Sequence, residues 1–595
     1  MPYFDADGKY QADPALLQRL PDWFPPDRKS QVPEDTFEIG LALAGAVSGG
    51  AYMAGFLDFM VQALDEWHAR RDEAQVPKHR VRLKTVAGAS AGGINAALLA
   101  FAARHRFRHG DQADPGLARE LESNPFYQTW VEQIDLRTLL KTDDLRGAED
   151  IHSLLNAQRL DEISRLIRTF FANTPAPPDL AQIRPWCADH FSVHFTLANL
   201  CGVPFSLGFR GDERGHLMRL HKDHCSFAVP VTRALEVLDY PPDHLRLTRN
   251  YQDQGWSQLL TAALATSAFP AALSARVVKR SRHDYDWRFV GCTEQGRYHY
   301  APPLWHLDQR PDQRWDPDHY SCLAVDGGAM DNEPFDLVHR ILAGLYGRNP
   351  RGALDANRAV IMVDPFPELP ALGPDAGRPI LETLMALVTA WMNNARFKPG
   401  DLLLAAEEDI YSRYLVVPRR PPNMGKLRFA AAGLGGFSGF LDVAYRHYDF
   451  FLGRLNAYKF FRDWFVLPES HPLFQGRVAP ASKATFASHL FPDHLQIIPL
   501  MGPPALVQEN AQYLPPWPKG QIDQHKLAEI EDLVTRRVSA LLPLLAGEVG
   551  EKLGGGMVGG SVKGLINLFR PLERKRLVGM VMEAIRQAVA SVEEG

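Results

Sequence analysis

Residues 81–103 read VRLKTVAGASAGGINAALLAFAA, and this stretch decides the fold that we expect. Residues 81–87 have the composition of a short buried strand, and residues 94–103 that of a helix packed against a sheet. The pentapeptide between them, GASAG at 88–92, matches the pattern GxSxG, which is typical of a nucleophile elbow when it joins a strand to a helix. Ser90 is therefore the predicted nucleophile. Gly88 and Gly92 are predicted to permit the strained backbone of the elbow, and the N-terminus of the following helix favours negative charge at Ser90.

The same order of strand, glycine loop and helix occurs once earlier in the chain. Residues 37–44 form an apolar run, GAVSGG follows at 45–50, and residues 51–67 carry apolar side chains at helical spacing. In a parallel sheet the two loops would meet at one edge, so the loop at 45–50 is expected next to Ser90. A serine nucleophile needs donors for the oxyanion, and the predicted backbone donors are Gly45, Ala46, Val47 and Gly49.

A glycine loop of this shape is also found at nucleotide-binding sites. A P-loop requires Gly-Lys-Ser/Thr at its end, whereas this loop continues Gly50-Ala51-Tyr52, and the GxGxxG pattern fails at Val47. Nucleotide binding is therefore disfavoured, although this second interpretation stays open at this point.

Alternating strands and helices predict an α/β layered domain. Further strands are expected at 193–200, 322–328 and 359–366, and helices at 381–397 and 448–465. We divide the chain into an irregular arm (1–35), a catalytic domain (36–365), a mainly helical extension packed on it (366–520) and a helical tail (521–595).

The composition is that of an ordinary globular protein. Apolar residues make up 46% and charged residues 23% of 595, and the net charge of −5 does not indicate a nucleic-acid partner. The N-terminus does not resemble a secretory signal, and no run approaches the roughly 18 apolar residues of a membrane-spanning helix. The cysteines are odd in number and lack metal-ligand spacing, which predicts buried free thiols in the cytoplasm: Cys187, Cys201, Cys225, Cys292 and Cys322.

Five segments, in order, resemble the patatin-like phospholipase family. GLALAGAVSGGAYMAGFL at 40–57 is similar to its oxyanion-loop segment, VAGASAGGINAALLA at 86–100 to its nucleophile elbow, and TLANLCGVPFSL at 196–207 to a following strand and hairpin. LATSAFPAALSAR at 264–276 resembles its Ala-Ser-Ser-Ala-x-Pro segment, and VDGGAMDNEPFDLV at 325–338 its Asp-Gly-Gly element. The aromatic-rich region from 448 is similar to C-terminal portions of large bacterial members.

The resemblance implies a three-layer α/β/α fold with a mainly parallel sheet, and a lipid acyl hydrolase of the phospholipase A or lysophospholipase kind. It implies a Ser-Asp dyad in which Asp326 takes the Ser90 proton, an acyl-enzyme intermediate, and no histidine, metal or cofactor. Gly327 and Gly328 would allow the turn that presents Asp326, and Asn332 would tie that loop together. The implied substrate is a phospholipid or another acyl-ester lipid.

The glycine loop departs from the family pattern. Members commonly have Gly-Gly-Gly-x-Arg/Lys-Gly, whereas this chain has Gly45-Ala46-Val47-Ser48-Gly49-Gly50, with no basic residue at Gly49. A second register would use Gly49 and Gly50 as donors, but it alters the distance to Gly55 in the following helix.

Two other functions are compatible with these motifs. A Ser-His-Asp hydrolase would use a histidine after the acid, and His339 and His447 are available. A lipid-binding or membrane scaffold would retain the fold without hydrolysis, which the altered glycine loop allows. The segment VKGLINLFRPLERKR at 562–576 combines apolar and basic residues, and it is either a docked tail helix or a peripheral membrane contact.

Overall fold

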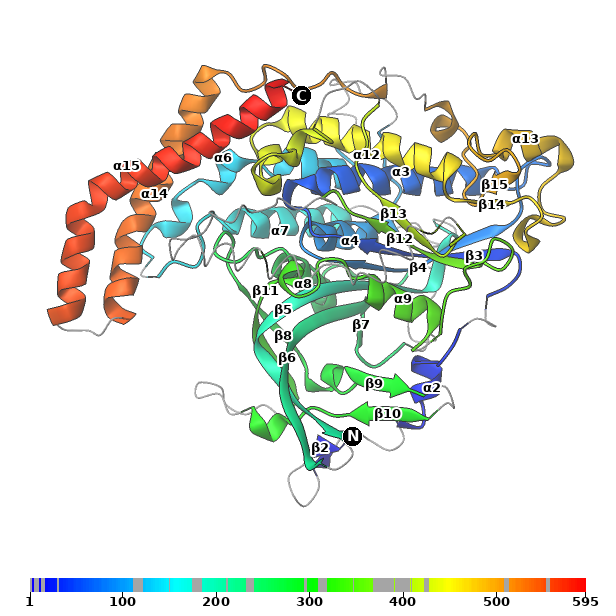
Figure 1. Cartoon of the computed structure of the whole chain (residues 1–595), viewed down its shortest axis with the longest axis horizontal. Coiled ribbons are helices and arrows are strands. Elements are labelled where there is room, and N and C mark those ends of the chain that lie inside the picture. Colours follow the sequence, from blue (N-terminus) through cyan, green and yellow to red (C-terminus); the bar gives the residue numbers. More distant parts are fainter. Residues whose placement is uncertain are drawn as a thin grey trace.

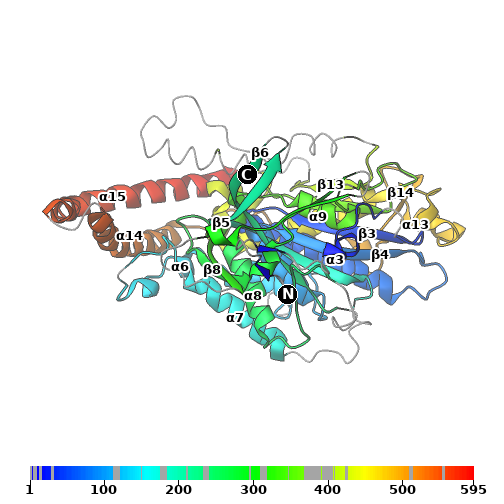
Figure 2. The same cartoon turned by 90° about the horizontal axis from the view of Figure 1, so that it is seen from below.

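The computed structural model describes residues 3–4, 10–11, 17–28, 32–110, 121–148, 150–173, 184–209, 212–231, 240–293, 297–308, 318–345, 347–366, 390, 407, 409–421, 427–507, 513–552 and 557–594. In this part of the chain a central sheet is covered by helices, and a pair of long helices extends from one end (Figures 1 and 2).

The central sheet has nine strands in the described chain, in the order β13-β12-β3-β4-β5-β11-β8, with β6 paired to β5 and β7 to β6. The strands from β13 to β5 are mutually parallel, whereas β6 and β11 pair antiparallel with β5 and β8 pairs antiparallel with β11. Their bounds are β3 (Thr36–Leu43), β4 (Arg80–Gly88), β5 (Cys187–Phe209), β6 (Asp212–Ala228), β7 (His244–Arg246), β8 (Arg276–Ser281), β11 (His319–Asp326), β12 (Arg358–Val363) and β13 (Arg413–Val416).

Helices cover both faces of the sheet, because the central strands bury both of their faces. On β3, Ile39 and Leu41 belong to the large core shared with helices α3 (Gly50–Ala69), α4 (Ala91–Ala102) and α12 (Val443–Asp463). Ala42 and Ala44 face the opposite side and pack with Val338 of helix α9 (Phe335–Ala343). The predicted three-layer α/β/α fold with a mainly parallel sheet is confirmed.

The described chain contains further α-helices and strands outside the central sheet and the four helices named above. They are β1 (Tyr3–Phe4), β2 (Tyr10–Gln11), α2 (Leu20–Trp23), α5 (Pro125–Tyr127), α6 (Leu136–Leu139), α7 (Gln158–Asn173), α8 (Gln254–Thr266), β9 (Phe289–Cys292), β10 (Tyr298–Ala301), β14 (Val466–Pro468), α13 (Lys483–Phe486), β15 (His494–Gln496), α14 (Gln524–Lys552) and α15 (Met557–Glu594). The helix predicted at 381–397 lies outside the described residues, apart from residue 390.

Helix α12, far along the chain, packs directly on α3 (Figure 1). A Cβ added at Gly55 of α3 would lie 1.8 Å from the Phe450 carbonyl oxygen, and one at Gly453 of α12 would lie 2.0 Å from the Tyr52 carbonyl oxygen. The two backbones therefore approach closely because glycine stands at both contact points. The helix predicted at 448–465 thus belongs to the same core as the glycine loop at 45–50.

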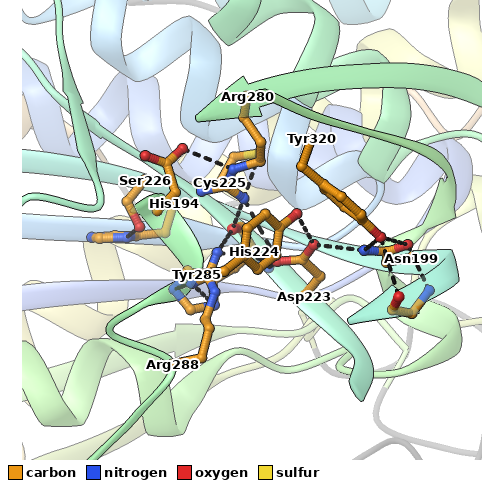
Figure 3. A network of polar contacts seen from close by, with 12 residues as sticks. His194, Asn199, Asp223, His224, Cys225, Ser226, Arg280, Tyr285, Arg288 and Tyr320 are labelled. Atoms are coloured by element: carbon orange, nitrogen blue, oxygen red, sulfur yellow. Dashed lines mark hydrogen bonds and ion pairs between the residues drawn. The ribbon is translucent and has the colours of Figure 1, made fainter. Parts of the chain in front are cut away.

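A network of buried polar side chains connects strands β5, β6, β8 and β11 and the residues that follow β8 (Figure 3). Asp223 of β6 accepts hydrogen bonds from the Tyr285 hydroxyl at 2.7 Å, from Arg288 Nη2 at 3.1 Å and from Asn199 Nδ2 of β5 at 3.2 Å. A buried carboxylate is stable only when it is paired and hydrogen-bonded in this way. The network lies beside β11, the strand that ends at Asp326.

The C-terminal helices α14 and α15 lie side by side and project from the body (Figures 1 and 2). The last turns of α15 return to the body, where Ile585 and Val592 are buried and the Trp517 Nε1–H donates to the Val592 carbonyl at 2.8 Å. The side chains of residues 551–573 lie outside the described part, so membrane contact through 562–576 stays a prediction. Among the described helices, none combines the length and apolar character that a membrane span requires.

The five cysteines carry free thiols, with Cys187, Cys225 and Cys322 buried and Cys201 and Cys292 half-buried. The prediction of buried free thiols is confirmed for Cys187, Cys225 and Cys322 but is wrong about the burial of Cys201 and Cys292. The cytoplasmic location stays a prediction.

Candidate active site

Ser90 lies at a strained turn between β4 and α4. Its φ is 51°, in the left-handed region that a residue with a side chain seldom adopts. A Cβ at Gly92 would lie 2.2 Å from the Leu43 carbonyl oxygen, so the tight turn requires glycine there. The local sequence therefore produces the elbow that it predicts, with Ser90 directly before the first residue of α4.

Asp326 ends β11 beside Ser90. Its carboxylate accepts a hydrogen bond from the Gly328 N–H at 2.7 Å, and the neighbouring Ser90 hydroxyl also favours its ionised form. The residue is 1% exposed, and burial raises the pKa of its carboxyl group to about 7. Among the described residues, the Ser90 hydroxyl has no histidine partner. The structure therefore brings together the nucleophile and the acid that were predicted from separate parts of the sequence.

The C-terminal end of α8 contacts both of these residues. The Thr266 Oγ1 accepts a hydrogen bond from the Ser90 N–H at 3.0 Å, and the Ala268 carbonyl accepts one from the Asp326 N–H at 2.9 Å. From the sequence, this segment was recognised only by its resemblance to the family, and no role was predicted for Thr266. The signal available in the sequence was the segment itself, LATSAFPAALSAR, between the two site motifs.

The glycine turn, residues 45–50, lies against the elbow. A Cβ at Gly45 would lie 3.1 Å from the Ser90 Cβ and 2.3 Å from the Asn332 Oδ1. The Gly45 N–H also donates to the Asn332 carbonyl at 3.2 Å, which ties the loop after Asp326 to the glycine turn. Asn332 therefore joins the two loops, and the short turn η10 (Gly327–Ala329) follows Asp326 directly.

Two of the four predicted oxyanion donors already have acceptors. Gly45 donates to Asn332, and the Gly49 N–H donates to the Ala46 carbonyl at 2.7 Å within the turn η2 (Val47–Gly49). In the described structure the N–H groups of Ala46 and Val47 have no acceptor within the protein. In this conformation the Gly45 N–H is thus engaged with the loop that follows Asp326 and the Gly49 N–H within the turn, and the oxyanion donors stay a prediction.

Gly49 is packed where many family members carry a basic residue. A Cβ at this position would lie 3.1 Å from both the Phe366 ring and Pro365. A long basic side chain would need these neighbours to move. The described residues contain no group of three or more His, Cys, Asp or Glu side chains placed to bind a metal ion.

A strained serine at a strand–helix elbow, beside a buried carboxyl group, is an arrangement found in serine hydrolases. A family model described as patatin-like phospholipase matches residues 41–339, and the chain belongs to this family. The chain is 32% identical over 558 residues to an uncharacterised protein, y4iI, of Sinorhizobium fredii. The matched region covers 86% of this chain and 76% of that protein. The solved structure of VipD from Legionella pneumophila is 11% identical and covers 99% of this chain and 94% of that chain with a TM-score of 0.20, so the assignment does not rest on it.

Proposed function

We propose that this protein is a lipid acyl hydrolase that cleaves carboxylic esters through a Ser90–Asp326 dyad and an acyl-enzyme. The observation that carries the proposal is the position of Ser90, at a strained strand–helix elbow, beside the buried Asp326 carboxyl group. Family membership implies a lipid ester as the general class of substrate.

In the first half-reaction, the Ser90 Oγ attacks the ester carbonyl carbon as its proton passes to Asp326. The carbonyl oxygen becomes an oxyanion, and the Asp326 proton then passes to the alcohol as the C–O bond breaks and the acyl-enzyme forms. In the second half-reaction, Asp326 accepts a proton from water as the water oxygen attacks the acyl carbon. The proton then passes from Asp326 to the Ser90 Oγ as the bond between the acyl carbon and Ser90 breaks, which releases the carboxylic acid and restores the free serine. A carboxyl group with a pKa of about 7 is a better proton acceptor than an exposed aspartate.

The oxyanion needs preorganised donors in this scheme. The N–H groups of Ala46 and Val47 are the candidates within the glycine turn, because those of Gly45 and Gly49 are engaged. The N-terminus of α4 directly after Ser90 adds favourable electrostatics. Each donor of this kind contributes on the order of 3–4 kcal/mol to transition-state stabilisation.

A small apolar cavity of about 30 Å³ lies beside α4, and we propose that it widens to receive the acyl chain of the substrate. It is lined by one face of α4, beginning one helical turn after Ser90, and by apolar residues of α7 and α8: Ile94, Ala97, Leu98, Phe101, Leu160, Ile163, Ile167, Leu260, Ala263 and Leu264. Thr129, Ile134 and Ser164 complete the lining. An acyl group bonded to Ser90 would follow the α4 face, and burial of each methylene contributes about 0.8 kcal/mol.

Filling this cavity is expected to change acyl-chain preference. Ala97→Leu should lower kcat/KM for long-chain esters at least tenfold, because the added atoms occupy space that the chain would use. Esters of acetate or butyrate should change less than about twofold and serve as the internal control. The measurement is kcat/KM for p-nitrophenyl esters of increasing length. An equal loss at every length would show that this cavity does not hold the acyl chain.

Labelling of Ser90 tests the proposal directly. Wild-type protein should react with a fluorophosphonate probe and release fatty acid from phospholipid vesicles, while Ser90→Ala should do neither. Lipid product analysis would then identify the head group and the position of cleavage. Folded wild-type protein that is neither labelled nor active would instead favour a lipid-binding scaffold. Retention of labelling after Ala substitution of His339 and His447 would separate the dyad from a Ser-His-Asp scheme.

A further inference from the structure

A segment that lies almost 400 residues further along the chain covers the glycine turn, residues 45–50. We call residues 430–440 the covering segment; it consists of three short turns, η11 (Ala430–Ala432), η12 (Leu434–Gly436) and η13 (Ser438–Phe440). Ser48 of the glycine turn is fully buried beneath it. The Ser48 hydroxyl donates to the Gly436 carbonyl and accepts from the Gly439 N–H at 3.1 Å. The Ser48 hydroxyl thus donates one hydrogen bond to the covering segment and accepts one from it.

The covering segment also contacts the strained residue of the turn. Val47 has a φ of 46°, which is unfavourable for a β-branched side chain and persists only when the surroundings hold it. Gly436 lies against it, because a Cβ at Gly436 would be 3.2 Å from the Val47 Cβ and 2.9 Å from the Phe366 ring. The residue whose N–H group is a candidate oxyanion donor is therefore packed against the covering segment.

Helix α12 fixes both ends of the covering segment. The Asp449 carboxylate accepts hydrogen bonds from the N–H groups of Ala430 and Ala431 at 2.7 and 2.9 Å. The buried Arg446 donates from Nη1 to the Gly439 carbonyl at 2.8 Å. Because α12 packs backbone to backbone on α3, and α3 begins where the glycine turn ends, the two loops are held in one rigid frame.

We infer that the covering segment holds the glycine turn in its donor conformation, with Ser48 and Gly436 as positioning residues for the Ala46 and Val47 N–H groups. The inference rests on the proposed hydrolase activity and gives part of the C-terminal extension a role in it. The glycine turn lacks a basic residue at Gly49. It is instead hydrogen-bonded through Ser48 to backbone atoms of Gly436 and Gly439.

Two neighbouring glycines allow a matched test. Gly435 and Gly436 both have positive φ, 59° and 98°, so alanine is strained at each. A Cβ at Gly435 would meet no atom within 4 Å, whereas one at Gly436 would press on Val47 and Phe366. Gly436→Ala is expected to lower kcat for a p-nitrophenyl ester about 10- to 100-fold with KM within about twofold, because only the oxyanion donors are displaced. Gly435→Ala should retain wild-type kcat.

A second pair keeps the inference testable if Gly436→Ala does not fold. Ser48→Ala removes both hydrogen bonds to the covering segment and is expected to lower kcat in the same way. Ser438→Ala is the control, because its hydroxyl donates within the covering segment to the Ala430 carbonyl at 3.5 Å. Fluorophosphonate labelling rates should follow kcat, and the dependence of kcat/KM on pH should keep its wild-type midpoint because the dyad is intact.

The possible results separate a failure of this inference from a failure of the proposed function. A kcat loss in Gly436→Ala or Ser48→Ala, with thermal unfolding equal to that of its control, supports the positioning role. Equal kcat in all four full-length variants, with Ser90→Ala inactive, would overturn the inference and leave the hydrolase activity in place. An unlabelled and inactive wild type would overturn the proposed function itself, and this inference with it.

Discussion

Asp326→Asn is expected to lower kcat for ester hydrolysis by about 10⁴-fold, the size of loss seen when an acid partner is neutralised in a serine hydrolase. The amide fits the same space and can still accept from the Gly328 N–H, but it cannot take the Ser90 proton. KM should stay within about twofold, because the carboxylate acts on the serine proton rather than on the bound substrate. The measurement is steady-state kinetics on a p-nitrophenyl ester, together with the rate of fluorophosphonate labelling.

Asp331→Asn is the matched control. It lies in the loop that follows Asp326, is largely buried, and pairs with Lys222 Nζ at 2.9 Å rather than with Ser90. Its loss of kcat should be less than about threefold, the size of a lost peripheral ion pair. If Asp326→Asn kept more than a tenth of wild-type kcat while Ser90→Ala was inactive, another group would have to be the base.

The rate is expected to depend on pH through the same carboxyl group. Burial raises the pKa of Asp326 to about 7, and only its ionised form accepts the Ser90 proton. The value of kcat/KM should therefore fall about tenfold for each pH unit below 7 and be level above it. The profile from pH 5 to 9 checks this, and Asp331→Asn should retain the midpoint although burial raises its own pKa to about 6. A level profile down to pH 5 would contradict it.

The raised pKa of Asp326 also predicts that the protein becomes less stable over the pH range in which its activity rises. The pKa of Asp326 rises from 3.8 to about 7 on folding, so the favourable contribution of its protonated form is complete below pH 4 and is lost as pH rises through 7. Because the folded protein raises this pKa to about 7, ionisation of the buried group at pH 8 costs about 4 kcal/mol of stability. Asp326→Asn removes this cost, and its free energy of unfolding should exceed that of wild type by about this amount at pH 8. The gain should vanish towards pH 4, which urea unfolding at both pH values would measure.

Much of the fold follows from patterns that are local in the sequence. The strand, the GxSxG turn and the following helix lie within 23 residues, and backbone preferences over such distances are decided by neighbouring side chains. Ser90 and its left-handed φ were accordingly predictable. The strand expected at 322–328 ends earlier, at Asp326, because Gly327 begins a short turn that presents the carboxylate.

Asp326 is a different case, because Asp-Gly is common in ordinary turns. The residues alone did not distinguish it, and its assignment came from the order of five segments that resemble the family. The family model over residues 41–339 confirms the family, while the role of Asp326 stays a proposal that rests on its buried position beside Ser90.

The sequence by itself determined the elbow at Ser90, because the turn depends on residues within one or two turns of chain, and the alternation of strands and helices predicted a layered α/β domain. Only the tertiary structure decided which groups hold the site. Thr266 bonds to Ser90 across 176 positions, and the Gly439 N–H bonds to Ser48 across 391. It also decided that the Gly45 N–H bonds to Asn332 and the Gly49 N–H to Ala46, and that the carboxyl group of Asp326 is buried enough for its pKa to rise. These contacts depend on how distant segments pack, and no local preference of the chain encodes them.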